Sequence, residues 1–135
     1  MKFMYARAQA AGVEFVEIAG ARLEYRWIEA RDPDAATLVF LHEGLGCLDA
    51  WREFPARLCA ATGLAGLVYS RQGYGRSDAA LAPRPVSYLH REAHVVLPRL
   101  LQTLGVGRHV LFGHSDGASI ALLYAGAEPR EGLEV

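Results

Sequence analysis

The first third of the chain contains two segments in which hydrophobic and polar residues alternate, at 13–18 and 23–28. Alternation with a period of two is typical of strands with one buried face, and Ala19-Gly20 between them favours a turn. Three later segments are short and largely apolar, at 37–41, 66–69 and 109–112. Apolar runs of this kind are typical of strands buried on both faces of a parallel sheet. The pattern predicts an antiparallel hairpin followed by parallel interior strands.

Apolar residues recur at helical spacing between these strands. They predict helices near 54–61, 87–104 and 118–125. Pro55 suits a first helical turn and Gly63 suits a helix end, whereas Ser87 is a possible N-cap and Pro98 predicts a kink within the second helix. Strand and helix therefore alternate, which predicts a doubly wound α/β sheet in a single domain over 1–135, with ligands beyond the carboxyl ends of the strands.

Composition narrows the range of partners. The chain has 135 residues, is 52% hydrophobic, and carries 14 basic and 15 acidic residues for a net charge of −1, without charged blocks. This balance provides no patch for nucleic acid or an anionic membrane surface, so we expect small, roughly neutral partners. The amino terminus lacks the apolar segment of a signal peptide, and no apolar run approaches the ~20 residues of a membrane span. We expect a cytoplasmic protein.

One motif carries candidate chemistry. Gly113-His114-Ser115-Asp116-Gly117 matches G-x-S-x-G, and it lies between a predicted strand and a predicted helix, as a nucleophile elbow requires. Such a turn exposes the serine hydroxyl, and the glycines allow strand and helix to approach closely. A serine at a helix amino terminus also lies where amides and the helix dipole stabilise negative charge. Ser115 is therefore the candidate nucleophile.

Two further motifs accompany the first. In chain order the three are His42-Glu43-Gly44, Gly73-Tyr74-Gly75-Arg76-Ser77-Asp78 and Gly113–Gly117. Together they resemble the oxyanion loop, the G-x-G-x-S-D loop and the nucleophile elbow of the α/β-hydrolase fold family, and the resemblance covers the chain from the first hairpin onward. The family's fold, a mostly parallel sheet with an amino-terminal antiparallel hairpin, agrees with the predicted elements.

The resemblance implies roles for individual residues. Ser115 would attack an acyl carbon and form an acyl-enzyme, and the backbone amides of Gly44 and Asp116 would form the oxyanion hole. The other elbow residues are Gly113, His114 and Gly117. A serine here argues against relatives with an aspartate nucleophile, such as epoxide hydrolases. The implied substrate is a small ester, thioester or related carbonyl compound, and esterase, thioesterase, carbon–carbon hydrolase and acyltransferase all remain open.

Three positions depart from the family pattern. Glu43 replaces the usual glycine of the oxyanion loop, which leaves open which amide there points inward. Ser70 stands where many relatives carry an aspartate that is more often structural than catalytic. The Asp116 carboxylate either lies near the pocket, where it would discourage anionic substrates, or faces solvent, and we favour solvent.

Motifs for cofactors are missing. Gly73-x-Gly75 lacks the third glycine of a dinucleotide loop, and no phosphate-binding G-x-x-x-x-G-K-[ST] occurs. His90 and His94 have a spacing that suits a metal, but no third ligand is evident, so a solvated helix face is favoured. We expect neither a cofactor nor a metal.

The family's order of catalytic residues is serine, then acid, then histidine. The 20 residues after Ser115 include Glu128, Glu131 and Glu134 but no histidine. Among the upstream histidines, the resemblance gives His42 and His114 structural places. We therefore expect the chain to be the nucleophile half of a hydrolase, inactive alone.

The last residues support the same expectation. Gly132-Leu133-Glu134-Val135 has the pattern of the beginning of a sixth strand, so we expect a sheet truncated there. The 109–112 strand would then have an apolar edge open to self-association or to a complementing chain. Two alternatives to a hydrolase fragment remain: a non-catalytic binding or interaction protein that kept the fold, and one half of a split hydrolase.

Overall fold

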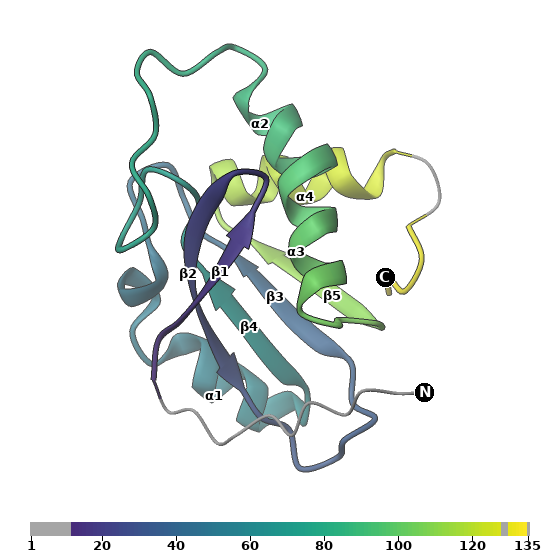
Figure 1. Cartoon of the computed structure of the whole chain (residues 1–135). Helices are drawn as coiled ribbons and strands as arrows, with labels where there is room; N and C mark the ends of the chain where they lie inside the picture. Colours follow the sequence, from purple (N-terminus) through teal and green to yellow (C-terminus); the bar gives the residue numbers. More distant parts are fainter. Residues whose placement is uncertain (1–11, 128–129, 135) are drawn as a thin grey trace.

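A computed structural model describes residues 12–127 and 130–134. Its five strands form one mixed sheet in the order β1-β2-β4-β3-β5 (Figure 1). They are β1 (Glu14–Ile18), β2 (Ala21–Ile28), β3 (Thr37–Leu41), β4 (Ala65–Tyr69) and β5 (His109–Gly113). β2 is antiparallel to β1 and β4, whereas β3 is parallel to both β4 and β5. The predicted hairpin and parallel interior strands are confirmed.

Helices cover both faces of the sheet (Figure 1). They are η1 (Leu48–Trp51), α1 (Phe54–Thr62), α2 (Tyr88–Arg91), η2 (Glu92–Val96), α3 (Leu97–Thr103) and α4 (Asp116–Ala125). One core cluster joins strand residues such as Val39 and Leu67 to α3 and α4, and a second joins Phe40 and Val68 to η1 and α1. Neighbouring residues of β3 and β4 thus point into opposite cores, which is why these strands are continuously apolar.

The predicted helix 87–104 is interrupted. A π-helical turn, η2, separates α2 from α3 immediately before Pro98. Proline has no N–H to donate and its ring crowds the carbonyl four residues earlier, so the wider turn accommodates Pro98.

Helix ends agree with the sequence in part. Pro55 lies in the first turn of α1, and Gly63 ends that helix in the left-handed region with φ 74°. These two predictions are confirmed. Ser87 precedes α2, but its side chain makes no capping hydrogen bond. α4 begins at Asp116, two residues before the predicted start, because the turn at Ser115 leads directly into the helix.

β5 forms one edge of the sheet. Residues Gly132–Glu134 touch this edge through a single parallel bridge, in which His109 N–H donates to Gly132 O at 2.7 Å and Glu134 N–H donates to His109 O at 2.8 Å. The side chains of Val110, Leu111 and Phe112 are only partly buried. Within the described ranges, no helix combines the length and apolar character that crossing a bilayer requires.

Candidate active site

The turn between β5 and α4 holds Ser115 in an unusual backbone conformation. Its φ is 54° and its ψ is −115°, a region that side-chain-bearing residues rarely adopt. The Ser115 side chain is exposed, and no described residue hydrogen-bonds to its hydroxyl. A strained, exposed serine at the start of a helix has the geometry of a nucleophile elbow.

Two glycines make this turn possible. A Cβ on Gly113 would lie 2.5 Å from Gly117 O and 2.6 Å from the Ala118 N. A Cβ on Gly117 would collide with Leu41 O at the end of β3. Both obstacles are backbone, which cannot rotate away. The elbow therefore packs directly on the neighbouring strand end.

His42 directly follows β3 and is completely buried. Its Nδ1 lies 2.7 Å from Glu43 O, and its Nε2 lies 3.1 Å from the Arg71 backbone N. The carbonyl can only accept and the amide can only donate, which assigns the proton to Nδ1 and the lone pair to Nε2. Burial, followed by the Arg71 charge, lowers the pKa of His42 to about 4. Both ring nitrogens are therefore occupied, and the ring is neutral.

Glu43 and His114 connect the loop after β3 to the elbow. Glu43 Oε2 lies 3.1 Å from His114 Nδ1, and His114 N–H donates to Leu41 O at 3.1 Å. A hydrogen bond from its own backbone amide and one from His114 hold the pKa of Glu43 below its ordinary value. The glutamate that replaces the family's glycine thus turns its carboxylate toward the elbow. This carboxylate fills the space beside Gly46, where a Cβ would lie 2.6 Å from Glu43 Oε1.

Gly44 lies next to Asp116. A Cβ on Gly44 would lie 2.7 Å from Asp116 Oδ2, and the Asp116 side chain is partly buried. The Asp116 carboxylate thus lies against the loop after β3. In the described part of the chain, neither the Gly44 N–H nor the Asp116 N–H has a hydrogen-bond acceptor. Two amides without a protein acceptor in this part of the chain are therefore available, one directly after Ser115 and one in the loop that lies against Asp116.

Sequence reasoning missed Arg71, which follows β4 and has no exposed surface. Its guanidinium donates to His42 O at 2.6 Å, to Glu43 O at 3.1 Å and to Tyr88 Oη at 2.8 Å. No periodicity indicates such a residue, because a single arginine after a strand is normally solvated. Its place between two family motifs is the only available signal.

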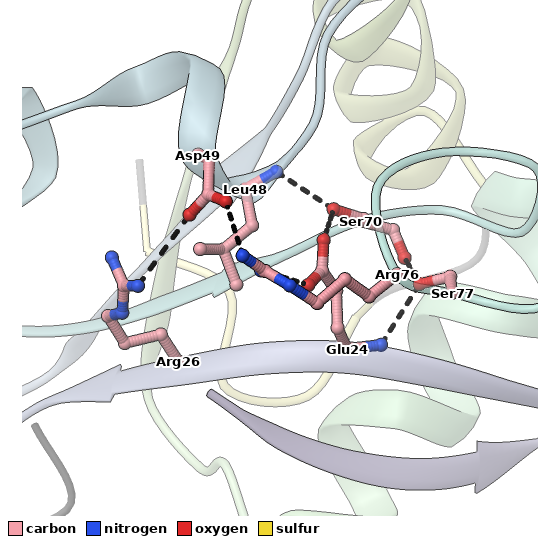
Figure 2. Close-up of polar contacts among 7 residues, drawn as sticks. All are labelled: Glu24, Arg26, Leu48, Asp49, Ser70, Arg76 and Ser77. Carbon is pink, nitrogen blue, oxygen red and sulfur yellow. Dashed lines mark hydrogen bonds and ion pairs between the residues drawn. The ribbon is translucent and has the colours of Figure 1, made fainter. Parts of the chain in front are cut away.

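A second buried network surrounds Ser70 (Figure 2). The Ser70 hydroxyl donates to Glu24 Oε1 at 2.6 Å and accepts the Leu48 N–H at 2.8 Å. Glu24 lies on β2 and is completely buried. Ser70, at the position where the resemblance leads us to expect an aspartate, thus pairs with a carboxylate from the adjacent strand.

The network continues toward the surface (Figure 2). Arg76 Nη1 lies 3.0 Å from Glu24 Oε2, and Arg76 Nη2 lies 2.9 Å from Asp49 Oδ2. Ser77 Oγ donates to Ser70 O at 2.7 Å and accepts the Glu24 N–H at 2.9 Å. The G-x-G-x-S-D loop therefore holds β2, β4 and η1 together.

Replacing Ser70 by alanine is expected to destabilise the fold by about 1–3 kcal/mol. The change removes the partner of the Leu48 amide and one partner of a buried carboxylate oxygen. Urea unfolding followed by circular dichroism measures the loss. Ser87→Ala is the control, because Ser87 is exposed and makes no capping bond, so its effect should stay within about 0.5 kcal/mol. Equal losses of unfolding free energy in Ser70→Ala and Ser87→Ala would contradict a stabilising role for the hydrogen bonds of Ser70.

The two histidines with metal-compatible spacing lie on consecutive elements, His90 in α2 and His94 in η2. His90 and His94 are exposed, their ring centroids are 6.1 Å apart, and His94 Nδ1 accepts a hydrogen bond from Arg130 Nη2 at 3.2 Å. No group of three or more His, Cys, Asp or Glu side chains among the described residues could hold a metal ion.

An open hollow lies over η1 and α1. It is lined by Trp51, Arg52, Glu53, Phe54, Arg57, Leu58 and Ala61, and it includes neither Ser115 nor Gly44. The Trp51 ring lies 6.5 Å from the His114 ring, so this largely apolar surface adjoins the elbow.

The fold and the site define a class: a doubly wound sheet in which a strand–turn–helix presents a serine. The sequence matches the family model of the alpha/beta hydrolase fold over residues 36–131, most of its 135 residues. The chain belongs to the α/β-hydrolase fold family. A comparison with proteins of curated function finds no match.

Solved structures share the fold. An α/β hydrolase from Novosphingobium aromaticivorans is 26% identical, with a TM-score of 0.71, and the match covers 87% of this chain and 40% of that one. Mouse alpha/beta hydrolase domain-containing protein 10 is 22% identical, with a TM-score of 0.70, and the match covers 91% of this chain and 47% of the mouse protein. Proline iminopeptidase of Mycobacterium smegmatis is 22% identical, with a TM-score of 0.71, and the match covers 90% of this chain and 41% of the peptidase. The chain spans less than half the length of these structures.

Proposed function

We propose that the chain carries the nucleophile half of a serine hydrolase, with Ser115 as the nucleophile. The observation that carries this proposal is the positive φ of Ser115, 54°, at the amino terminus of α4. Strain of this kind is maintained only where the surrounding structure enforces it, and it clusters at functional sites. The glycines at positions 113 and 117 allow the close packing of strand and helix that maintains it here.

The oxyanion hole in this proposal consists of the Gly44 and Asp116 amides. Both lack an acceptor among the described residues, and the Asp116 amide also lies at the positive end of the α4 dipole. When the Ser115 oxygen bonds to an acyl carbon, the carbonyl oxygen gains negative charge, which these two donors stabilise. The serine proton passes to the histidine that is proposed below to come from outside these residues, and that histidine returns it to the leaving group. The bond from the acyl carbon to the leaving oxygen or sulfur breaks, so an alcohol or thiol departs and the acyl-enzyme remains.

The substrate in this proposal is a small, neutral acyl compound. The Asp116 carboxylate beside Gly44 disfavours anionic substrates by charge repulsion. The apolar hollow around Trp51 and Phe54 adjoins the elbow and suits an apolar acyl group. These features support ester, thioester and related carbonyl substrates without separating them.

The acid and the histidine of the triad are proposed to come from outside these 135 residues. His42 uses both ring nitrogens inside the fold, and His114 is paired with Glu43. The partly buried β5 edge is the proposed docking site for the complementing segment, because a parallel strand added there would continue the sheet.

Acylation by p-nitrophenyl acetate tests the nucleophile. p-Nitrophenolate is a good leaving group, and the proposed oxyanion hole stabilises the developing charge even without the base, so slow acylation is expected. The Ser115 oxygen bonds to the acetyl carbon, the serine proton passes to solvent and p-nitrophenolate leaves. Peptide mapping by mass spectrometry should place an acetyl group on Ser115, which accumulates because no base activates water.

Two variants and a second probe make the result specific. Ser115→Ala should lose this acetylation, whereas Ser119→Ala, an exposed serine on the same helix, should keep it. A fluorophosphonate, which requires an activated serine, should leave the isolated chain unlabelled. Rapid labelling that depends on Ser115 would show a base within the chain. A folded chain that is never acetylated at Ser115 would favour a non-catalytic binding protein.

A further inference from the structure

Arg71 is a buried cation whose charge also acts on the buried carboxyl group of Glu92. It has no exposed surface, yet it forms no ion pair with a carboxylate in the described part of the chain. Burying a charge is costly unless hydrogen bonds compensate it. Its guanidinium directs two of its three hydrogen bonds to consecutive carbonyls, those of His42 and Glu43.

These bonds fix one peptide group from several sides. Glu43 O accepts from Arg71 Nη2 at 3.1 Å, from His42 Nδ1 at 2.7 Å and from the Gly46 amide at 3.1 Å. The Arg71 backbone amide also donates to His42 Nε2 at 3.1 Å. Arg71 therefore also fixes the imidazole ring that donates to Glu43 O. The Glu43–Gly44 peptide therefore cannot rotate without breaking contacts to Arg71 and His42.

The orientation of the carbonyl determines the orientation of the amide. In a trans peptide, the C=O of Glu43 and the N–H of Gly44 point in opposite directions. With the carbonyl directed into the buried cluster, the Gly44 N–H points away from it, and it has no acceptor among the described residues. A positive charge at the carbonyl oxygen also polarises the peptide and makes its N–H a stronger donor.

We propose that Arg71 is a positioning residue that holds and polarises the Glu43–Gly44 peptide so that the Gly44 amide serves as an oxyanion donor. This inference rests on the proposed function, because it takes Gly44 as part of the oxyanion hole. It also accounts for the glutamate in the oxyanion loop: the backbone clamp orients the peptide, so a glycine at position 43 is not required.

The first test is spectroscopic and needs no activity. In the isotope-labelled chain, a scalar coupling across the hydrogen bond from the Arg71 guanidinium to the Glu43 carbonyl is expected. Arg71→Lys keeps the charge but loses the guanidinium group that donates to both carbonyls. The chemical shifts of the Glu43 carbonyl carbon and the Gly44 amide nitrogen should therefore both move upfield. Arg84→Lys is the matched control, because Arg84 contacts Tyr74 and Gln72 and should leave both signals in place.

The second test connects the clamp to the chemistry. Acetylation of Ser115 by p-nitrophenyl acetate should slow at least tenfold in Arg71→Lys and remain unchanged in Arg84→Lys, because losing one oxyanion donor costs about 10²–10³ in rate. Unchanged rates and signals in Arg71→Lys would overturn the clamp. Absence of acetylation in the parent chain would overturn the proposed function. The NMR signals of the Glu43 carbonyl carbon and the Gly44 amide nitrogen would still test whether Arg71 holds this peptide. If Arg71→Lys does not fold, the test is the scalar coupling between the Arg71 guanidinium and the Glu43 carbonyl in the parent chain. Its absence would overturn the proposed role of Arg71.

Discussion

Gly117→Ala is expected to remove the native fold of the isolated chain or to destabilise it by about 3 kcal/mol or more. The new methyl group would overlap Leu41 O and lie 2.5 Å from the Leu41 carbonyl carbon and 2.9 Å from His42 O. These are backbone atoms at the end of an interior strand, so α4 would have to move off the sheet. Circular dichroism and urea unfolding measure the effect.

Gly107→Ala is the matched control. Gly107 is exposed, and a Cβ there would meet no atom within 4 Å. The substitution should leave stability within about 1 kcal/mol of the parent, and a small gain is expected because alanine restricts the unfolded chain. Equal midpoints for the two variants would contradict the close approach between α4 and β3.

The strands and helices could be predicted because their signals are local. The apolar run in 37–41 predicts a strand buried on both faces, as β3 is, and the alternation in 23–28 predicts the strand β2, although burial along β2 does not alternate. The family membership and the strand–turn–helix context of Ser115 followed from motifs in the same way. The roles proposed for Ser115, Gly44 and Asp116 stay predictions.

The polar interior could not be predicted. Glu24 breaks the alternation of β2, since Leu23 and Glu24 are both buried, and its partners Ser70 and Arg76 lie some fifty residues away. A charged residue in an exposed strand position and one in a buried network look alike in a sequence. Only tertiary contacts distinguish them, and the same holds for Arg71.

The sequence also could not predict the direction in which the Asp116 side chain points. Whether its carboxylate meets solvent or the pocket depends on how the loop after β3 lies against the start of α4. The structure places it against Gly44 because that residue has no side chain to exclude it.

Glu92 should make stability depend on pH. It lies in the π-helical turn with 4% of its surface exposed, and its Oε2 has no hydrogen-bond partner among the described residues. Burial raises its pKa from 4.5 to about 7, while the charges of Arg71, Arg91 and Arg84 act in the opposite direction. The folded state thus binds the proton more tightly than the unfolded chain, so the stability from this group is complete below about pH 4.5 and is lost as pH rises through 7.

Glu92→Gln should therefore stabilise the chain increasingly at higher pH. Relative to the parent, its free energy of unfolding should rise by about 2–3 kcal/mol between pH 5 and pH 8, because one pKa unit corresponds to about 1.4 kcal/mol. His42, whose pKa is lowered to about 4, weakens both proteins at low pH and cancels in the comparison. Urea unfolding at several pH values measures the difference, with the exposed Glu17→Gln as the control. A difference for Glu92→Gln that stays constant with pH would contradict the raised pKa and would mean that the charges of Arg71, Arg91 and Arg84 offset the effect of burial.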